Sequence, residues 1–187
     1  AVASLGLSHH FFFSASLGGG RVRTELERAV QPSLLDRLTD EAPQVPADPP
    51  TTQDASVRAF RAGVLRDLGW LLNTRRSIEP LPPGVVELHR SVHQYGLPDT
   101  TGVPIGDKYG RQTLVKELAD AIERFEPRLA APRVTIGQLS QVLAPQVRFG
   151  VEATLRMDPS PEAVSFDAVL EVARGEFEVG GGRPPAR

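Results

Sequence analysis

The chain has 187 residues, of which 40% are hydrophobic and 24% charged, a balance that allows one packed domain with tails and argues against wholesale disorder. Its formal net charge of −2 gives no electrostatic reason to expect a nucleic-acid partner or an anionic membrane surface. The absence of cysteine excludes disulfides, thiolate metal sites and a cysteine nucleophile.

We interpret residues 1–32 as an N-terminal extension that is either loose or docked on a partner through its phenylalanine run, residues 11–13. That run is far shorter than the roughly 20 apolar residues of a membrane-spanning helix, so we expect no membrane insertion. No basic n-region precedes it, so we expect no secretory signal. Residues 33–52 then predict a short helix from Ser33 to Leu38 followed by a proline-rich linker.

The domain proper is expected at residues 53–179, with a flexible tail at residues 180–187. Its clearest element is a helix over residues 54–73, where apolar side chains recur at steps of three and four. These side chains are Val57, Phe60, Val64, Leu68 and Leu71.

Two further features of this helix concern its ends and its outer face. Asp54 or Ser56 is expected to cap the start of the helix, and Asn73 is expected to cap its end. Trp70 lies about 120° from the centre of the apolar stripe. It therefore faces either the chain's own N-terminal arm or a partner protein.

A short helix is expected at residues 84–94, and a third helix at residues 113–125, which Pro127 stops. His89 and His93 stand four apart in the first of these and would share a helix face, as zinc ligands do. No third ligand lies nearby, so we expect solvated or partner-facing histidines and neither a metal site nor a cofactor.

Beyond residue 146 the apolar period changes from 3.6 to 2, which is typical of half-buried strands. Strands are expected at residues 147–155 and 164–172, with a final strand through residues 177–179 and a weaker one at residues 134–136. Helices followed by strands predict an α+β fold: three main helices on one face of a small, mostly antiparallel sheet, with an extended N-terminal arm.

Paired carboxylates are the only sign of enzymatic chemistry that needs weighing. Glu123 and Glu126 stand three apart at the end of the third helix, and a glycosidase uses two such groups. However, Arg124 and Arg128 flank Glu126, and neighbouring cations favour an ionised carboxylate over the protonated one that a general acid needs. We therefore expect an ion-pair cluster and no catalytic residue.

The segment around Pro127 nevertheless stands out, because an acidic and a basic residue flank a proline that ends a helix. Proline restricts the backbone, so Glu126 and Arg128 project in defined directions. A rigidly held pair of this kind suits either an internal strut or recognition of another chain. The residues by themselves leave both interpretations open.

Four short motifs occur in order along the chain, and together they resemble a known family. Over about residues 33–179 the chain is similar to TssE, the type VI secretion relative of a phage tail baseplate wedge protein. The motifs are Ser33-Leu34-Leu35-Asp36-Arg37-Leu38, Val64-Leu65-Arg66-Asp67-Leu68 running into Leu71-Leu72-Asn73-Thr74-Arg75, Tyr95-Gly96-Leu97-Pro98-Asp99, and Phe125-Glu126-Pro127-Arg128-Leu129.

The resemblance implies a non-enzymatic α+β subunit of a baseplate wedge, beside the larger wedge proteins TssF and TssG. It implies a cytoplasmic location at the inner face of the bacterial envelope and, through the wedge, an association with a baseplate that contains TssK. In this family the motif corresponding to Glu126, Pro127 and Arg128 supports contact with the helical core bundle of TssF and TssG.

We add Trp70, Tyr95 and Asp99 to these three residues as partner-binding candidates. The family also resembles the interlocking part of contractile sheath subunits. The resemblance therefore implies that the sheet from about residue 147 to residue 179 offers an edge to which the first sheath ring adds strands.

Two alternatives remain. One is a peptidoglycan-cleaving, lysozyme-like enzyme that uses Glu126 with Glu123 or Asp120, for which purified protein should clear a cell-wall substrate. The other is the equivalent wedge protein of a phage or other contractile particle, which the neighbouring genes would identify.

Overall fold

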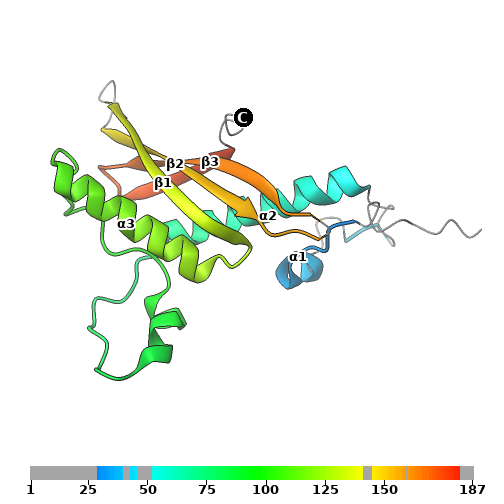
Figure 1. Ribbon diagram of the computed structural model, residues 1–187, viewed down its shortest axis with the longest axis horizontal. Helices are drawn as coiled ribbons and strands as arrows, with labels where there is room; N and C mark the ends of the chain where they lie inside the picture. The colour runs from blue at the N-terminus through cyan, green and yellow to red at the C-terminus, as the bar shows by residue number, and fades with distance from the viewer. Residues whose placement is uncertain (1–28, 40–42, 46–51, 141–144, 159, 182–187) are drawn as a thin grey trace, which may run out of the picture.

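The computed structural model describes residues 29–39, 43–45, 52–140, 145–158 and 160–181. These residues form an α+β fold in which two long helices cover one face of a four-stranded antiparallel sheet, so the expected fold class is confirmed (Figure 1). The helices are α1 (Leu34–Leu38), α2 (Gln53–Asn73) and α3 (Lys108–Phe125), and the strands, in the order in which they neighbour one another, are β1 (Leu129–Ser140), β2 (Gln146–Leu155), β3 (Glu162–Glu171) and β4 (Glu176–Gly181).

Several expectations fall on the remaining residues. Most of the expected N-terminal extension, its phenylalanine run included, lies outside the described residues, as do most of the proline-rich linker and residues 182–187 of the expected tail. Within the described part, no helix is both long and apolar enough to cross a membrane.

The core lies between the two long helices and the inner face of the sheet. The period-2 pattern of β2 and β3 sends every second side chain to this face, and the polar side chains between them point to the other face. The buried strand residues are Val147, Phe149, Val151, Ala153 and Leu155 on β2, and Val164, Phe166, Ala168 and Leu170 on β3.

β1 is longer than the sequence pattern suggests: the expected strand covered residues 134–136, and the observed one spans Leu129–Ser140. Its register against β2 shifts twice, between Ala130 and Arg133 and between Ile136 and Leu139. Such bulges interrupt the two-residue alternation from which strands are recognised. Pro132 is tolerated here because β1 is an edge strand, where a missing N–H costs little.

The residue that caps the start of α2 also differs from expectation. Thr52 is the cap, with its Oγ1 accepting a hydrogen bond from the Ala55 N–H at 3.3 Å, whereas Asp54 and Ser56 lie inside the helix. The Ser56 hydroxyl instead accepts from the Val30 N–H at 2.9 Å. This bond holds Val30, which is 7% exposed, in the core beside α2.

The third helix begins five residues before the expected residue 113. Asp107 caps it, with Oδ2 accepting from the Tyr109 N–H at 3.2 Å. The first turn is hard to recognise in the sequence because it contains Gly110, where a Cβ would lie 2.3 Å from the Pro104 carbonyl oxygen. Glycine here serves close packing rather than helix propensity.

The prediction of a single helix at residues 84–94 is wrong. Two short 3₁₀ helices, η2 (Val86–Arg90) and η3 (Val92–Gln94), occupy the segment, and neither buries a residue. Ser91 separates them by donating to the Leu88 carbonyl at 2.8 Å and accepting from the His93 N–H at 3.3 Å. His89 and His93 therefore lie on different helices, and no metal-holding group of three acidic, histidine or cysteine residues occurs among the residues described here.

Residues 76–95 form a lobe that projects from the body below α3 (Figure 1). Its two ends are joined at the base, because the Leu97 N–H donates to the Thr74 carbonyl and the Arg76 N–H donates to the Leu97 carbonyl, both at 2.9 Å. A long excursion with tied ends is typical of compact surface loops that carry function.

Asn73 does not cap the end of α2, a position that Thr74 takes. Its amide nitrogen donates to the Phe177 carbonyl at 2.9 Å, and its Oδ1 accepts from the Phe177 N–H at 2.8 Å. Because these backbone groups of β4 bond Asn73, they point away from β3. Asn73 therefore covers the outer edge of β4 at Phe177.

We expect Asn73→Ala to lower the free energy of unfolding by about 1 kcal/mol, because water only partly replaces the two lost hydrogen bonds. Urea denaturation measures the change, with the exposed Gln112→Ala as a control expected to stay within about 0.5 kcal/mol of the unaltered chain. Equal stability of the two variants would show that this amide contact contributes nothing to the fold.

Candidate functional site

A groove of about 370 Å³ lies between α1, α2 and the turn that follows α3. We call it the α1–α2 groove. It brings together five of the six partner-binding candidates, which are far apart in the sequence. The lining residues are Ser33, Leu35, Asp67, Trp70, Leu71, Tyr95, Phe125, Glu126, Pro127 and Arg128.

The charged floor of the groove is built around Arg128. Its Nε donates to Glu126 Oε1 at 2.7 Å, and its Nη2 bonds both Glu126 Oε2 and Asp67 Oδ2, the latter at 2.6 Å. Glu126 is only 4% exposed. A buried carboxylate with both oxygens bonded to one guanidinium is the two-pronged geometry that arginine favours.

The network continues from Asp67 to α1. Arg66 donates to Asp67 Oδ1 through Nε at 2.9 Å and Nη2 at 2.7 Å, and its Nη1 donates to Asp36 Oδ1 at 2.7 Å. Asp36 also accepts from the Ser33 hydroxyl at 2.5 Å. An alternating series of acids and arginines therefore joins α1, α2 and the turn after α3.

These contacts shift the pKa of two groove residues. Hydrogen bonding to Glu126, and to a smaller extent to Asp67, raises the pKa of Arg128 above its already high ordinary value, although burial opposes the shift. Burial raises the pKa of Tyr95, and the negative charges of Asp67 and Glu126 add to that shift. Arg128 is thus permanently charged, and the Tyr95 hydroxyl stays neutral at physiological pH.

The aromatic wall of the groove remains partly open to solvent. Trp70 is 52% exposed, with the Arg66 guanidinium 4.8 Å from its ring centroid. Tyr95 packs edge-to-face on Phe125 with ring centroids 5.4 Å apart. Because Trp70 shares the groove with Leu35, it lies beside α1, and about half of its surface stays open to solvent.

Asp99 is the partner-binding candidate that does not line the groove. It lies at the base of the lobe, where its Oδ1 accepts from the Thr101 N–H at 3.1 Å and its Oδ2 is 4.0 Å from Arg75. The Thr101 hydrogen bonds, with a smaller contribution from Arg75, lower the pKa of Asp99.

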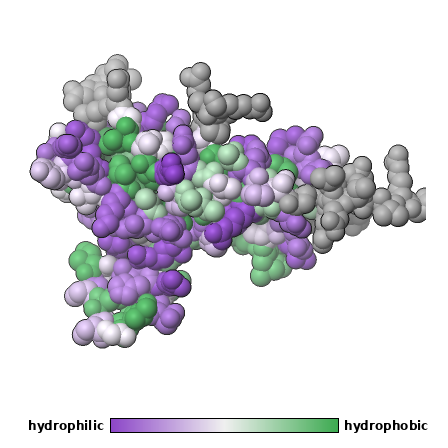
Figure 2. Space-filling view, viewed as in Figure 1, coloured by the Kyte–Doolittle hydropathy of each residue, from purple (hydrophilic) through white to green (hydrophobic). Residues whose placement is uncertain are grey.

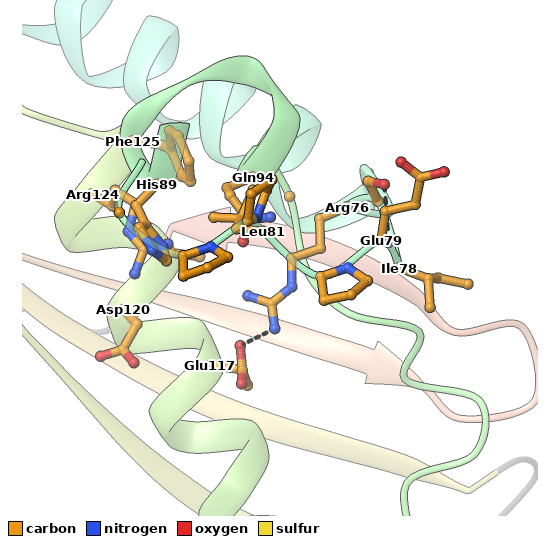
Figure 3. Close-up of a pocket in the computed structure, with 17 residues that line it drawn as sticks. Arg76, Ile78, Glu79, Leu81, His89, Gln94, Glu117, Asp120, Arg124 and Phe125 are labelled. Carbon is orange, nitrogen blue, oxygen red and sulfur yellow. Dashed lines mark hydrogen bonds and ion pairs between the residues drawn. The ribbon is translucent and has the colours of Figure 1, made fainter. Parts of the chain in front are cut away.

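A second, larger hollow of about 560 Å³ lies between the lobe and the outer side of α3 (Figure 3). Arg76 from the base of the lobe pairs with Glu117 on α3 at 3.1 Å across it, and His89, Asp120 and Arg124 also line it. Glu126 lines the α1–α2 groove instead, and Glu123 lines neither hollow. The carboxylates considered for peptidoglycan cleavage therefore do not converge on one site.

Sequence reasoning missed the residues that complete the site. Asp67, Arg66 and Asp36 lie inside two of the quoted motifs, but nothing in their spacing indicates that they bond one another or Arg128. The sequence held one local indication of these residues: Arg66 and Asp67 are adjacent charged residues on α2, next to the buried Leu68.

We expect the docking of α1 to weaken in acid. The Ser33 hydroxyl, and then Arg66, lower the pKa of Asp36. Because its folded-state pKa lies below the unfolded value of about 3.9, its stabilising effect is present above that pH and is lost as the pH falls through the folded value. Emission from Trp70, the single tryptophan, should report this change, and Asp36→Asn should remove that part of the titration. Identical acid titrations of the two proteins would contradict the assignment.

Comparison with protein families gives one match. The family model described as baseplate wedge protein gp25 matches residues 58–160. The matched segment contains Asp67, Trp70, Tyr95 and the Glu126-Pro127-Arg128 turn, whereas α1, β3 and β4 lie outside it. Neither the curated proteins nor the solved structures provided a match.

Proposed function

Because the chain belongs to the baseplate wedge protein gp25 family, we propose that it is a non-enzymatic structural subunit of a type VI secretion baseplate wedge. It acts in the cytoplasm at the inner face of the cell envelope, where it joins the TssF and TssG core bundle to the first ring of the contractile sheath. Through the wedge it associates with a baseplate that contains TssK. Family membership carries the structural role, and the α1–α2 groove supports the contact with the core bundle.

The groove supports this role because it combines a rigid charged floor with an open aromatic wall. The Arg128 side chain donates to both Glu126 and Asp67, so these bonds hold the turn after α3 in one shape. Pro127 of this turn and Trp70 of the neighbouring α2 are both exposed to solvent. Half-exposed tryptophans of this kind are frequent anchors of protein interfaces.

The same bonds argue against the lysozyme-like alternative. A general acid must hold a proton that it can transfer, and both Glu126 oxygens accept hydrogen bonds from the Arg128 guanidinium. Asp120 lies in the separate hollow beside the lobe. Turnover on a cell-wall substrate is therefore not expected.

The two edges of the sheet differ in their capacity to accept a sheath strand. β1 is broken by two register shifts and contains Pro132, features that oppose pairing with a further strand. On β4, Asn73 covers the backbone groups of Phe177 at the outer edge of the sheet. The next residues whose backbone groups point to that same edge are Val179 and Gly181, at the C-terminal end of the strand. We propose that the sheath strand adds to β4 at this end.

We expect the unaltered chain to co-purify with TssF and TssG, and Trp70→Ala to weaken binding by about 30-fold, as the loss of a central tryptophan anchor does. Tyr109→Ala is the matched control, because Tyr109 is also an exposed aromatic residue, at 76%, but does not line the groove. Both variants should fold normally.

If folded TssF and TssG do not bind the unaltered chain, the secretion assignment is wrong. Binding instead to the wedge subunits of a phage or another contractile particle would assign the chain to that machine. An equal loss for Trp70→Ala and Tyr109→Ala would place the contact elsewhere on the surface.

A further inference from the structure

The part of the lobe that follows α2 contains a run of prolines. Residues 79–83 have the sequence Glu-Pro-Leu-Pro-Pro and belong to no helix or strand, and we call them the proline segment. Pro80, Pro82 and Pro83 are exposed, and Leu81 is only partly buried. The lobe that carries the segment projects from the body and shows hydrophobic residues among hydrophilic ones (Figure 2). The prolines are therefore presented to solvent.

Proline chemistry restricts the shape of this segment. A proline holds φ at about −65°, and a residue that precedes a proline is confined to extended conformations. Every residue of the proline segment either is a proline or precedes one. The segment therefore favours the polyproline II conformation, which loses little conformational entropy on binding. Gly84, with a φ of +88°, ends the segment in a turn.

The backbone of the segment is free to interact with another protein. No backbone–backbone hydrogen bond joins residues 77–84 to any other residue that the structure describes. The Glu79 N–H donates only to the nearby Ser77 hydroxyl, at 3.3 Å. An open, solvated backbone is typical of polyproline II segments, whose carbonyl groups stay available to a binding partner. Backbone hydrogen bonds nevertheless tie the lobe at its base, so the segment is held on a fixed support.

A hollow separates the proline segment from the body of the protein. Residues 80–83 line one side of the 560 Å³ hollow, and α3 lines the other (Figure 3). Arg76 and Glu117 form an ion pair at 3.1 Å across it, at the base of the lobe. The hollow therefore leaves space for side chains of another protein beside the prolines.

The charge of the segment adds a requirement for its partner. Glu79 is exposed, and its carboxylate forms no ion pair with any residue that the structure describes. It is also the only charged residue among residues 79–83. A cationic side chain would complement Glu79 at the end of the proline run.

We propose that the proline segment is a ligand for another protein, which binds it in a shallow groove lined by aromatic side chains, with a cation beside Glu79. Grooves of this kind recognise exposed polyproline II segments. None of residues 79–83 lines the α1–α2 groove. The inference therefore goes beyond the proposed function, because it identifies a second contact on a different part of the surface.

The test uses an isolated WW domain as the probe, because its groove for proline-rich segments is lined by aromatic residues. Calorimetric titration should show binding to the unaltered full chain, and Pro80→Ala/Pro83→Ala should weaken that binding at least tenfold. Pro145→Ala/Pro161→Ala is the matched control, because these two prolines are also exposed but lie outside the lobe. The control should bind as the unaltered chain does.

Both double variants should unfold at the same urea concentration as the unaltered chain, because none of the four prolines is buried. No binding of the probe to the unaltered chain, or an equal loss in the two variants, would overturn the proposal and leave the segment as a stiff spacer. Because the WW domain is not a wedge component, this result is independent of the proposed function, which co-purification with TssF and TssG tests separately.

Two versions of the probe test the charged contact. A WW domain with lysine beside its groove should bind the unaltered chain about threefold more tightly than one with glutamine there, as an exposed ion pair allows. Glu79→Gln should remove this difference while it leaves the binding of the glutamine version unchanged. Equal affinity of the two versions for the unaltered chain would overturn the assignment of a cation beside Glu79.

Discussion

Replacing Arg128 by methionine is expected to lower the free energy of unfolding by about 3–5 kcal/mol. The Glu126 carboxylate is 4% exposed, and Arg128 supplies hydrogen bonds to both of its oxygens. The variant therefore leaves a buried charge without its partner, and it also removes a hydrogen bond to Asp67. Chemical denaturation of the isolated chain measures the change.

The double variant Glu126→Gln/Arg128→Met is the appropriate control. It removes the uncompensated charge, so it should recover part of the stability lost in the single variant. If Arg128→Met alone unfolds at the same denaturant concentration as the unaltered chain, the pair is not an internal strut. A large loss instead means that partner-binding defects of Glu126 or Arg128 variants must be compared at equal folded fraction.

The second large effect is expected for Gly96→Ala, which should destabilise the chain by about 3 kcal/mol or more. Gly96 has a φ of +100°, where an alanine is strained, and its Cβ would lie 2.2 Å from the Thr74 carbonyl oxygen. That oxygen accepts from the Leu97 N–H at the base of the lobe, and Leu97 is 2% exposed. The substitution therefore disturbs both a backbone tie and a core residue.

Gly84→Ala is the control that distinguishes backbone strain at a positive φ from steric overlap of the new Cβ. Gly84 has a φ of +88°, but beyond its chain neighbours no heavy atom lies within 4 Å of the place that an alanine Cβ would take. Only the conformational penalty of about 1–2 kcal/mol therefore applies. Thermal or urea unfolding of both variants provides the comparison. Similar losses in the two proteins would show that the close approach of Gly96 to Thr74 is unimportant.

The lobe and the α1–α2 groove are connected through Tyr95. This residue ends the lobe, packs on Phe125 at the end of α3 and lines the groove. A change at Gly96 therefore acts on the chain immediately next to a groove residue. For this reason Gly96→Ala serves as a test of stability, whereas Trp70→Ala serves as a test of binding.

The sequence by itself determined the elements whose apolar residues repeat with a clear period. α2, β2 and β3 each send regularly spaced side chains to one core, so local spacing and tertiary burial agree. The Glu126-Pro127-Arg128 turn was also recognisable, because proline at a helix end is a local signal. The resemblance to a wedge family rested on short motifs in order, and the family match over residues 58–160 confirms it.

The tertiary structure alone decided which residues these elements bring together. The bulges of β1 interrupt the two-residue alternation, so the sequence pattern indicated only a small part of that strand. Residues 84–94 do not form an α-helix because they lack the tertiary packing that stabilises one. Asn73 looked like a helix cap, but the end of α2 places it against β4, 104 residues later in the chain. Likewise, Arg128 donates a hydrogen bond to Asp67, which lies 61 residues earlier in the chain. Hydrogen bonds over such separations depend on how the layers pack, and no local pattern of residues encodes that packing.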